Sequence, residues 1–590
     1  MWFVCLVVLV VLAPPGWAQG PAAKDLDSLQ RQRNQIILQE EERRRREGLK
    51  LREPTLPESL RPPQSESEEA ADEGGPCFVF QDIRLAGVTR LTDAEQETLL
   101  EQDMGACLSL ADINRLLKAI TNVYIAKGYV LARAYLQSQD LSQGILEIVV
   151  FEGEIEDIEM FHNGERRRPA LQNVFPGLTG EVLNIRDLEQ GLDQIHRLRF
   201  HDGTITMEPG TKAGKTRIRV AVNRDRWVAG SLAVDNSGLS STGEELWEGT
   251  AAGYDLFGAY ESVSVTVKRT LGNPTGKRSQ SVSGYLSLPY GYWTFLWSSH
   301  HFEYETTVAG LNQRFASSGT NTTHTAEINR VLHRDDRGKT VLAAFLTSKT
   351  IRNFVAETLL VTGSRRLTIG GGRLAHVRQA FGGLANVSVT GEWGLSILGA
   401  LRDEDATEGA PRAQFTKWSV ELSYVHAWPV WGQRLTVSVN GRGQWSPHTL
   451  YASERINPGG QYTVRGFRNV GLNGDVGAYL RNELAWTLPL PTSPWVQSAF
   501  GPVEAFVGFD VGWLATDRRD PRERGQVAGW AIGLRARSGH LFGEAIFEKR
   551  LAAPAFLEQE AEIVRFQAGV SLQGLLLAVQ QPARWIGLLT

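Results

Sequence analysis

Strict alternation of apolar and polar residues dominates the chain from Trp227 onward. Runs of about ten residues with a period of two are separated by turns rich in Gly, Asn and Asp, and helical periodicity disappears. Such runs predict β-strands that each have one apolar face and one polar face. Clear cases are the segments 263–268, 418–424, 435–442, 479–486 and 564–572.

A soluble β-sandwich would alternate in the same way, so the period leaves two fold classes open. Three features favour a membrane barrel. The polar faces keep charged residues, as a water-filled lumen allows, and residues 227–572 suffice for roughly sixteen spanning strands. Aromatic residues also gather at strand ends, namely Tyr290, Tyr292, Trp293, Trp297, Trp428 and Trp431. We therefore predict a membrane β-barrel of about 16 antiparallel strands over residues 227–572.

Two consecutive units with the same order of elements, β-α-α-β-β, precede the predicted barrel at residues 77–152 and 153–226. In the first unit Thr92 and Glu95 have the spacing of a capping box. Ser109 then precedes a helix with apolar residues at helical spacing, and Asn184 starts the corresponding helix of the second unit. The repetition predicts two small α/β domains in tandem.

The first 76 residues divide into three segments of different composition. Residues 1–18 hold a short apolar run followed by small residues, which is typical of an export signal peptide, although no Lys or Arg precedes the run. Residues 19–50 predict a helix that is polar almost all round, and it is either idle in solvent or occupies a water-filled channel. Residues 51–76 are acidic and rich in proline, and they predict a disordered linker.

Composition narrows the functional classes. A formal net charge of −4 and a pI of about 6.3 provide no basic field, so we expect no nucleic-acid partner. A mean hydropathy of −0.22 excludes a helical membrane protein but not a barrel. If Cys5 leaves with the signal peptide, Cys77 and Cys107 remain as a pair. In an oxidising compartment they are expected to form a disulfide, and two free buried thiols are the alternative.

One glycine-rich segment, Ile456–Phe467, stands out between two alternating runs. Its glycines allow the chain to turn back on itself and to present Arg465, Gly466 and Phe467 at a tip. The guanidinium of Arg465 suits a carboxylate, and Asp510 shares its strand face with Gly508 and Gly512. We predict that a loop near 455–475 folds into the lumen and brings Arg465 to Asp510. The alternative is a surface turn followed by an unrelated strand.

Enzymatic chemistry has little support in the sequence. The segment 272–277 imitates a phosphate-binding loop but has three residues between its glycines in place of four. His300 and His301 lack further ligands at suitable spacing, so we interpret them as residues of the aromatic girdle. We expect no enzyme, no cofactor and no metal site.

With these parts in order, the sequence resembles the outer-membrane translocators of two-partner secretion, which are relatives of the barrel-assembly factor BamA. The resemblance covers the chain from about Lys24 to Leu572. It departs from the family where a tail, residues 573–590, continues past the expected last strand. Its most specific marks are Tyr285-Leu-Ser-Leu-Pro-Tyr-Gly-Tyr-Trp293, Arg330-Val-Leu-His-Arg-Asp-Asp-Arg337, Val464-Arg-Gly-Phe467 with Leu480-Arg-Asn-Glu-Leu484, and Gly508-Phe-Asp-Val-Gly512.

The resemblance implies a plug helix at 19–50, two periplasmic POTRA domains and a sixteen-stranded barrel whose sixth outer loop folds inward. It implies that Arg465 is the motif arginine of that loop and Asp510 its partner on the wall. The implied function is passage of a large unfolded exoprotein through the outer membrane of a Gram-negative bacterium, without ATP. The partner would bind the POTRA domains through its N-terminal secretion domain, and a monomeric barrel would lie in outer-membrane lipid. The alternatives are a BamA-like insertion factor for other barrels and a passive porin.

Overall fold

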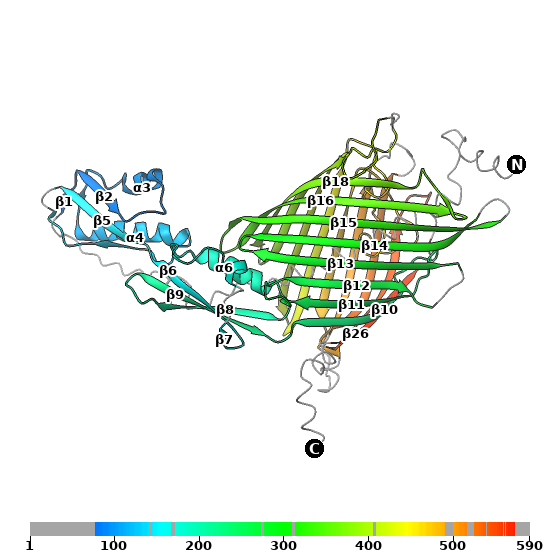
Figure 1. The fold of residues 1–590 in the computed structure, drawn as a ribbon, viewed down its shortest axis with the longest axis horizontal. Coiled ribbons are helices and arrows are strands. Elements are labelled where there is room, and N and C mark those ends of the chain that lie inside the picture. The colour runs from blue at the N-terminus through cyan, green and yellow to red at the C-terminus, as the bar shows by residue number, and fades with distance from the viewer. Residues whose placement is uncertain are drawn as a thin grey trace, which may run out of the picture.

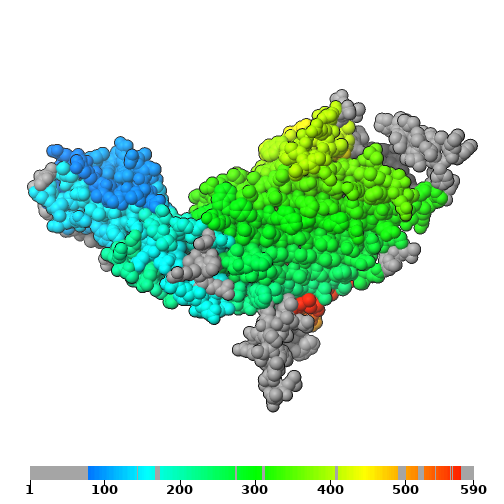
Figure 2. Space-filling view, in the orientation of Figure 1, coloured from blue at the N-terminus to red at the C-terminus, as the bar shows by residue number. Residues whose placement is uncertain are grey.

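The computed structural model describes residues 77–572 except 142–143, 167–170, 273–275, 310–312, 405–408, 490–499, 516–523, 538–539, 558–559 and 561. The predicted signal peptide, N-terminal helix, linker and C-terminal tail lie outside the described residues. Two small domains form an arm at one end of a wide barrel, and the second domain lies directly against the barrel (Figures 1 and 2). We call this end of the barrel proximal and the other end distal. In the described ranges, no helix is long and apolar enough to cross a bilayer.

The first small domain packs two helices against a three-stranded sheet of order β2-β5-β4. Thr92 and Ser109 each complete the capping box that starts a helix. A disulfide joins Cys77 to Cys107, with the two Cα atoms 5.3 Å apart. Leu110, the first residue of α4, is 64% exposed. The elements are β1 (Phe78–Val79), β2 (Asp82–Ala86), α3 (Asp93–Leu100), β3 (Cys107–Leu108), α4 (Leu110–Ala126), β4 (Arg133–Leu136) and β5 (Ile145–Phe151).

The second small domain repeats the plan with a four-stranded sheet of order β7-β6-β9-β8. The side chain of Asn184 accepts a hydrogen bond from the backbone of Arg186 at the start of α6. Tyr260, which belongs to a proximal loop of the barrel, is fully buried in this domain's core. The domain is therefore packed onto the barrel. Its elements are β6 (Glu154–His162), β7 (Glu165–Arg166), α5 (Leu171–Val174), α6 (Ile185–His196), β8 (His201–Pro209) and β9 (Lys215–Arg224).

Sixteen long antiparallel strands close the barrel in the described part of the chain, which confirms the predicted fold class. Closure joins Ser231–Asp235 of the first strand to Gln567–Ser571 of the last (Figure 1). The short β17 (Thr358–Leu359) pairs with the end of β16. The long strands are β10 (Val228–Asp235), β11 (Leu246–Tyr254), β12 (Ser262–Thr270), β13 (Arg278–Tyr290), β14 (Trp293–Ala309), β15 (Arg314–Arg334), β16 (Gly338–Val355), β18 (Arg365–Ala380), β19 (Gly383–Leu395), β20 (Thr416–Val430), β21 (Gln433–Trp445), β22 (Gly477–Thr487), β23 (Val503–Leu514), β24 (Gly525–Arg537), β25 (Leu541–Ala552) and β26 (Ile563–Ser571).

The two faces of the barrel wall follow the predicted alternation. On β23 the outward residues are apolar and exposed, with Phe509 at 51% and Trp513 at 46%, whereas Asp510 faces inward and is fully buried. An apolar outer surface is suited to lipid, and a polar inner surface is suited to a lumen. The period of two in the sequence therefore distinguishes the strand residues that face lipid from those that face the lumen.

Two expectations about the aromatic belt need correction. Trp293, Trp428 and Trp431 are exposed at proximal strand ends, but the hydroxyl of Tyr292 donates to Asp187 of the second domain at 2.7 Å. The histidines of the sequence pair lie in the middle of β14, not at an end. Each bonds a hydroxyl on a neighbouring strand, at 2.8 and 2.9 Å. Alternation shows which residues share a face but not their height along the barrel.

Candidate functional site: a loop folded into the barrel lumen

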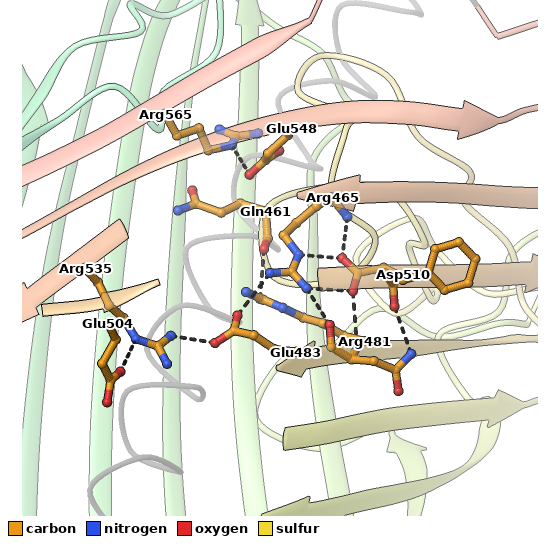
Figure 3. Close-up of polar contacts among 11 residues, drawn as sticks. Gln461, Arg465, Arg481, Glu483, Glu504, Asp510, Arg535, Glu548 and Arg565 are labelled. Carbon is orange, nitrogen blue, oxygen red and sulfur yellow. Dashed lines mark hydrogen bonds and ion pairs between the residues drawn. The ribbon is translucent and has the colours of Figure 1, made fainter. Parts of the chain in front are cut away.

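Residues 446–476 connect β21 to β22 at the distal end of the barrel and fold back into its lumen. Figure 3 shows Gln461 and Arg465 of this segment beside residues of the barrel wall. We call this segment the infolded loop. Two backbone hydrogen bonds between Ile456 and Gly474, of 2.9 and 3.0 Å, close its neck. Arg455 and Asp475 form an ion pair of 3.1 Å beside them. The loop beyond this neck is therefore a compact hairpin that is fastened at its base.

The interior of the hairpin is apolar and packs on the barrel wall. Phe467 and Val464 are fully buried and form one cluster with Leu514 of β23 and Val527 of β24. Burying a phenylalanine side chain contributes on the order of 1.5–3 kcal/mol. This cluster presses the loop against β23 and β24, which places the tip beside the charged inner wall.

At the tip, Arg465 and Asp510 meet and are both completely buried. The Arg465 guanidinium donates from Nε to Asp510 Oδ2 at 2.6 Å and from Nη2 to Asp510 Oδ1 at 2.8 Å. The backbone N–H of Arg465 also donates to Oδ2, at 3.0 Å. Two parallel bonds from one guanidinium are the strongest form of such a pair, because both carboxylate oxygens are satisfied in a fixed plane.

The remaining donors of Arg465 reach the next strand. Nη1 donates to Glu483 Oε2 at 3.1 Å, and Nη2 donates to the backbone carbonyl of Asn482 at 2.8 Å. Glu483 is in turn held by Arg535 of β24, at 2.5 Å. The buried guanidinium is thus neutralised and hydrogen-bonded on several sides, which a buried charge requires.

Glycines leave the space that this arrangement needs. Gly508 faces Glu483 across the β22–β23 ladder, and a Cβ at Gly508 would lie 2.0 Å from Arg465 Nη2. A Cβ at Gly512 would lie 2.6 Å from Cβ of Pro458. Gly466 has a φ of +90°, which residues with a side chain rarely adopt. A Cβ at this position would also meet the backbone of β25. The structure therefore brings together all six residues singled out at this loop and strand.

Three features around the tip did not follow from the sequence. The backbone N–H of Gly466 donates to Glu548 of β25 at 3.1 Å, and Glu548 accepts from Arg565 of β26 at 3.0 Å. A Cβ at Gly529 of β24 would lie 1.8 Å from the carbonyl oxygen of Arg465. Alternation predicts that Glu548 and Arg565 face inward, but only the strand register aligns them with the tip. We call Arg465, Glu483, Asp510, Glu548 and Arg565 the tip cluster (Figure 3).

A second group of charges joins the small domain to the proximal rim of the barrel. Arg334 of β15 forms ion pairs with Asp193 at 2.6 Å and Glu189 at 3.2 Å, both on α6. Lys339 of β16 also reaches Asp193, at 3.1 Å. Between α6 and the lumen lies a cavity of about 1340 Å³ that is lined by residues of both. The domain is therefore positioned over the proximal opening of the barrel.

The carboxyl of Asp193 makes this junction sensitive to acid. Burial would raise the pKa of Asp193, but the charges of Lys339 and Arg334 overcome that effect and hold the pKa below its ordinary value of 3.8. A group with a lowered pKa stabilises the folded arrangement above its ordinary pKa and loses this contribution as the pH falls through the lowered value. We therefore expect the domain to become looser against the rim only below about pH 3.8, where the contribution of Asp193 is lost. Distances between spin labels on the domain and the rim measure this.

The matched variant for that experiment is Arg334→Met, which removes one of the two cations beside Asp193. The pKa of Asp193 is then less depressed, so the loosening should move to higher pH. An unchanged midpoint in this variant would contradict the assignment of the acid sensitivity to Asp193. Lys277→Met is the control variant. It also removes a cation, but the Lys277 ammonium contacts the carbonyl of Ser240 on the distal side of the barrel, away from Asp193.

Comparison with known proteins finds the same architecture. A family model described as haemolysin secretion/activation protein ShlB/FhaC/HecB matches residues 214–536. A ShlB-type POTRA domain matches 78–153, and a further POTRA domain matches 154–209.

Two curated relatives and one solved structure are similar over most of the chain. The outer membrane transporter CdiB of Escherichia coli is 33% identical over 571 residues, covering 96% of this chain and 93% of the relative. The hemolysin transporter protein ShlB of Serratia marcescens is 30% identical over 479 residues, covering 79% of this chain and 80% of the relative. The solved structure of CdiB from Escherichia coli has a TM-score of 0.81 at 31% identity, covering 94% of this chain and all of that one.

Proposed function

Because this chain belongs to the haemolysin secretion/activation family of ShlB, FhaC and HecB, it is a two-partner secretion transporter of the outer membrane, and we propose that the infolded loop keeps its pore closed until a partner arrives. Transporters of this kind pass a secreted exoprotein from the periplasm to the cell surface. The proximal end of the barrel, with both POTRA domains, therefore faces the periplasm of a Gram-negative bacterium. The observation that carries the proposal is the fully buried pair of Arg465 and Asp510 inside the lumen.

The energetics support a tip that is released as a unit. The tip has its own apolar core and one dense set of charged hydrogen bonds, so partial release would leave buried charges without partners. Such states are costly, because removing one partner of a buried pair costs about 3–5 kcal/mol. We infer two states, with the tip cluster either formed or fully separated. Residues 19–50, outside the described part of the chain, are proposed to plug the resting pore, and folding of the exported chain outside would give direction without ATP.

The first POTRA domain is the proposed site of capture, through strand addition at β4. This strand lies at an edge of its sheet, and Tyr135 on it is 54% exposed. The backbone N–H of Ala134 points away from the sheet and donates to the hydroxyl of Thr121 on α4 at 3.2 Å. A strand from the N-terminal secretion domain of the exoprotein could replace that single hydroxyl, because backbone pairing along an edge needs little sequence complementarity.

Replacing Ala134 by proline should reduce export strongly while the domain stays folded. Proline removes the outward N–H, yet it is tolerated on an edge strand when that N–H is not part of the ladder. The measurement is the amount of exoprotein in the medium. The exoprotein is identified by mass spectrometry as the protein that is present in the medium of cells with this gene and missing from the medium of cells without it. Deletion of residues 77–225 should abolish the same signal.

Thr121→Val is the matched control, because it frees the N–H of Ala134 instead of removing it. Export should then stay at or above the normal level. Normal export by Ala134→Pro would contradict capture at β4, and normal export without residues 77–225 would refute capture by the POTRA domains altogether. For the barrel itself we propose a monomer surrounded by lipid, since its strands close on themselves and its outer face is apolar.

A further inference from the structure

A second buried ion cluster holds the base of the infolded loop and shares no side chain with the tip cluster. Glu454 is 3% exposed, and its carboxylate pairs with Lys349 of β16 at 2.7 Å and with Lys417 of β20 at 3.2 Å. The hydroxyl of Ser453 donates to the same carboxylate at 2.9 Å. Glu392 of β19 also pairs with Lys417, at 3.1 Å.

Apolar contacts reinforce this attachment. Leu450 is fully buried in a cluster with Ile369 of β18 and Phe415, which directly precedes β20. The backbone N–H of Thr416 donates to the ring of His448 at 3.0 Å. We call Lys349, Lys417, Leu450 and Glu454 the base cluster. It combines two ammonium groups and one apolar contact, all on the wall formed by β16 to β20.

The base cluster contacts β16 to β20 and the tip cluster contacts β22 to β26, and the order of strands places the outermost contacts of the two on opposite walls. Around the ring of sixteen long strands, β16 and β25 are eight positions apart in either direction. Glu454 bonds Lys349 on β16, and Gly466 bonds Glu548 on β25. The infolded loop therefore crosses the lumen from one wall to the other and is attached by charges at both ends.

We propose that Glu454 is a positioning residue that holds the base of the loop as a pivot when the tip cluster separates. The two clusters share no side chain, so loss of the tip contacts leaves the base contacts in place. The loop then turns about its base toward β16–β20 and opens the lumen along β22–β26, without leaving the barrel. A chain in transit would pass on the side where the tip had been. Only this last step rests on the proposed function.

Single-cysteine reporters in the purified full-length protein test the pivot. Thr449→Cys reports on the base and Thr463→Cys on the tip, and these threonines are 3% and 2% exposed. Once Cys5 has left with the predicted signal peptide, the disulfide between Cys77 and Cys107 leaves no other free thiol to react. With Arg465→Ala, a maleimide should label the tip cysteine at least roughly tenfold faster, while labelling of the base cysteine stays unchanged.

Glu454→Gln should give the opposite result, with rapid labelling at the base. Leu450→Ala should do the same by loosening the apolar contact alone, which excludes an effect of stranded charge. Glu327→Gln is the control, since Glu327 pairs with Arg373 on the lumen wall at 2.6 Å and touches no residue of either cluster. A folded barrel is verified for each variant by its heat-dependent shift on a gel.

Equal labelling of both reporters in Arg465→Ala would overturn the proposal, because the loop would then leave as one body. Unchanged base labelling in both Glu454→Gln and Leu450→Ala would also overturn it. These outcomes do not depend on export, so they separate failure of the pivot from failure of the proposed function. If the pivot is correct, Glu454→Gln should reduce export while Glu327→Gln should not.

Discussion

Replacing Arg465 by alanine is expected to reduce export of the partner and to raise the leak of ions, because the tip can no longer close the pore again, while the barrel stays folded in the outer membrane. The change leaves the carboxylate of Asp510 buried without its main partner, since three of its hydrogen bonds come from Arg465 and two of these are from the guanidinium. Losing one member of a buried pair costs about 3–5 kcal/mol. Such a loss favours the released loop by roughly a hundredfold or more. Export and the leak of ions through planar bilayers are the measurements.

Two companion variants separate charge from geometry. Arg465→Lys keeps the positive charge but cannot make the parallel bonds, so it should export at an intermediate level. Arg465→Ala combined with Asp510→Ala removes the stranded carboxylate and should recover stability without recovering export. Normal export by Arg465→Ala would show that the pair has no part in transport.

Replacing Gly508 by valine should have a comparable effect for a steric reason. The new Cβ would lie 2.0 Å from Arg465 Nη2, where no side chain fits without displacing the guanidinium. The pair with Asp510 should therefore fail to form although both of its residues are present. Reactivity of a cysteine at Thr463 measures loop release directly, and export measures its consequence.

Gly543→Val provides the matched control for that substitution. Gly543 is also a strand glycine of the barrel, but a Cβ there meets its nearest neighbour at 3.4 Å, an ordinary contact. Export by this variant should be near normal. If Gly508→Val and Gly543→Val behave alike, the space at Gly508 does not serve the loop.

Much of the fold and of the loop site follows from patterns of neighbouring residues in the sequence. The alternation on β23 placed Asp510, Gly508 and Gly512 on one inward face, and the structure has the same faces. Capping residues such as Thr92 and Ser109 located helix starts, because a cap depends only on residues a few positions away. The glycine-rich segment around Arg465 indicated an infolded tip, because so few residue types tolerate its backbone angles.

Other features could not be obtained in this way. Tyr292 was assigned to the aromatic belt but contacts Asp187, which lies more than a hundred residues away. The alignment of Glu548 and Arg565 with the tip depends on the stagger of each strand against its neighbour. That stagger is set by pairing around the whole ring, to which a single strand contributes only its period.

By itself, therefore, the sequence determined the class of each element, the inward or outward face of each strand residue and the charged tip of one loop. These properties depend on neighbours within a few positions along the chain. Only the tertiary structure decided that the loop crosses the lumen and that Glu454 meets Lys349 on the wall opposite Glu548. The physical reason is closure: sixteen strands become a ring only when the last pairs with the first, and which walls then face each other is a property of the ring.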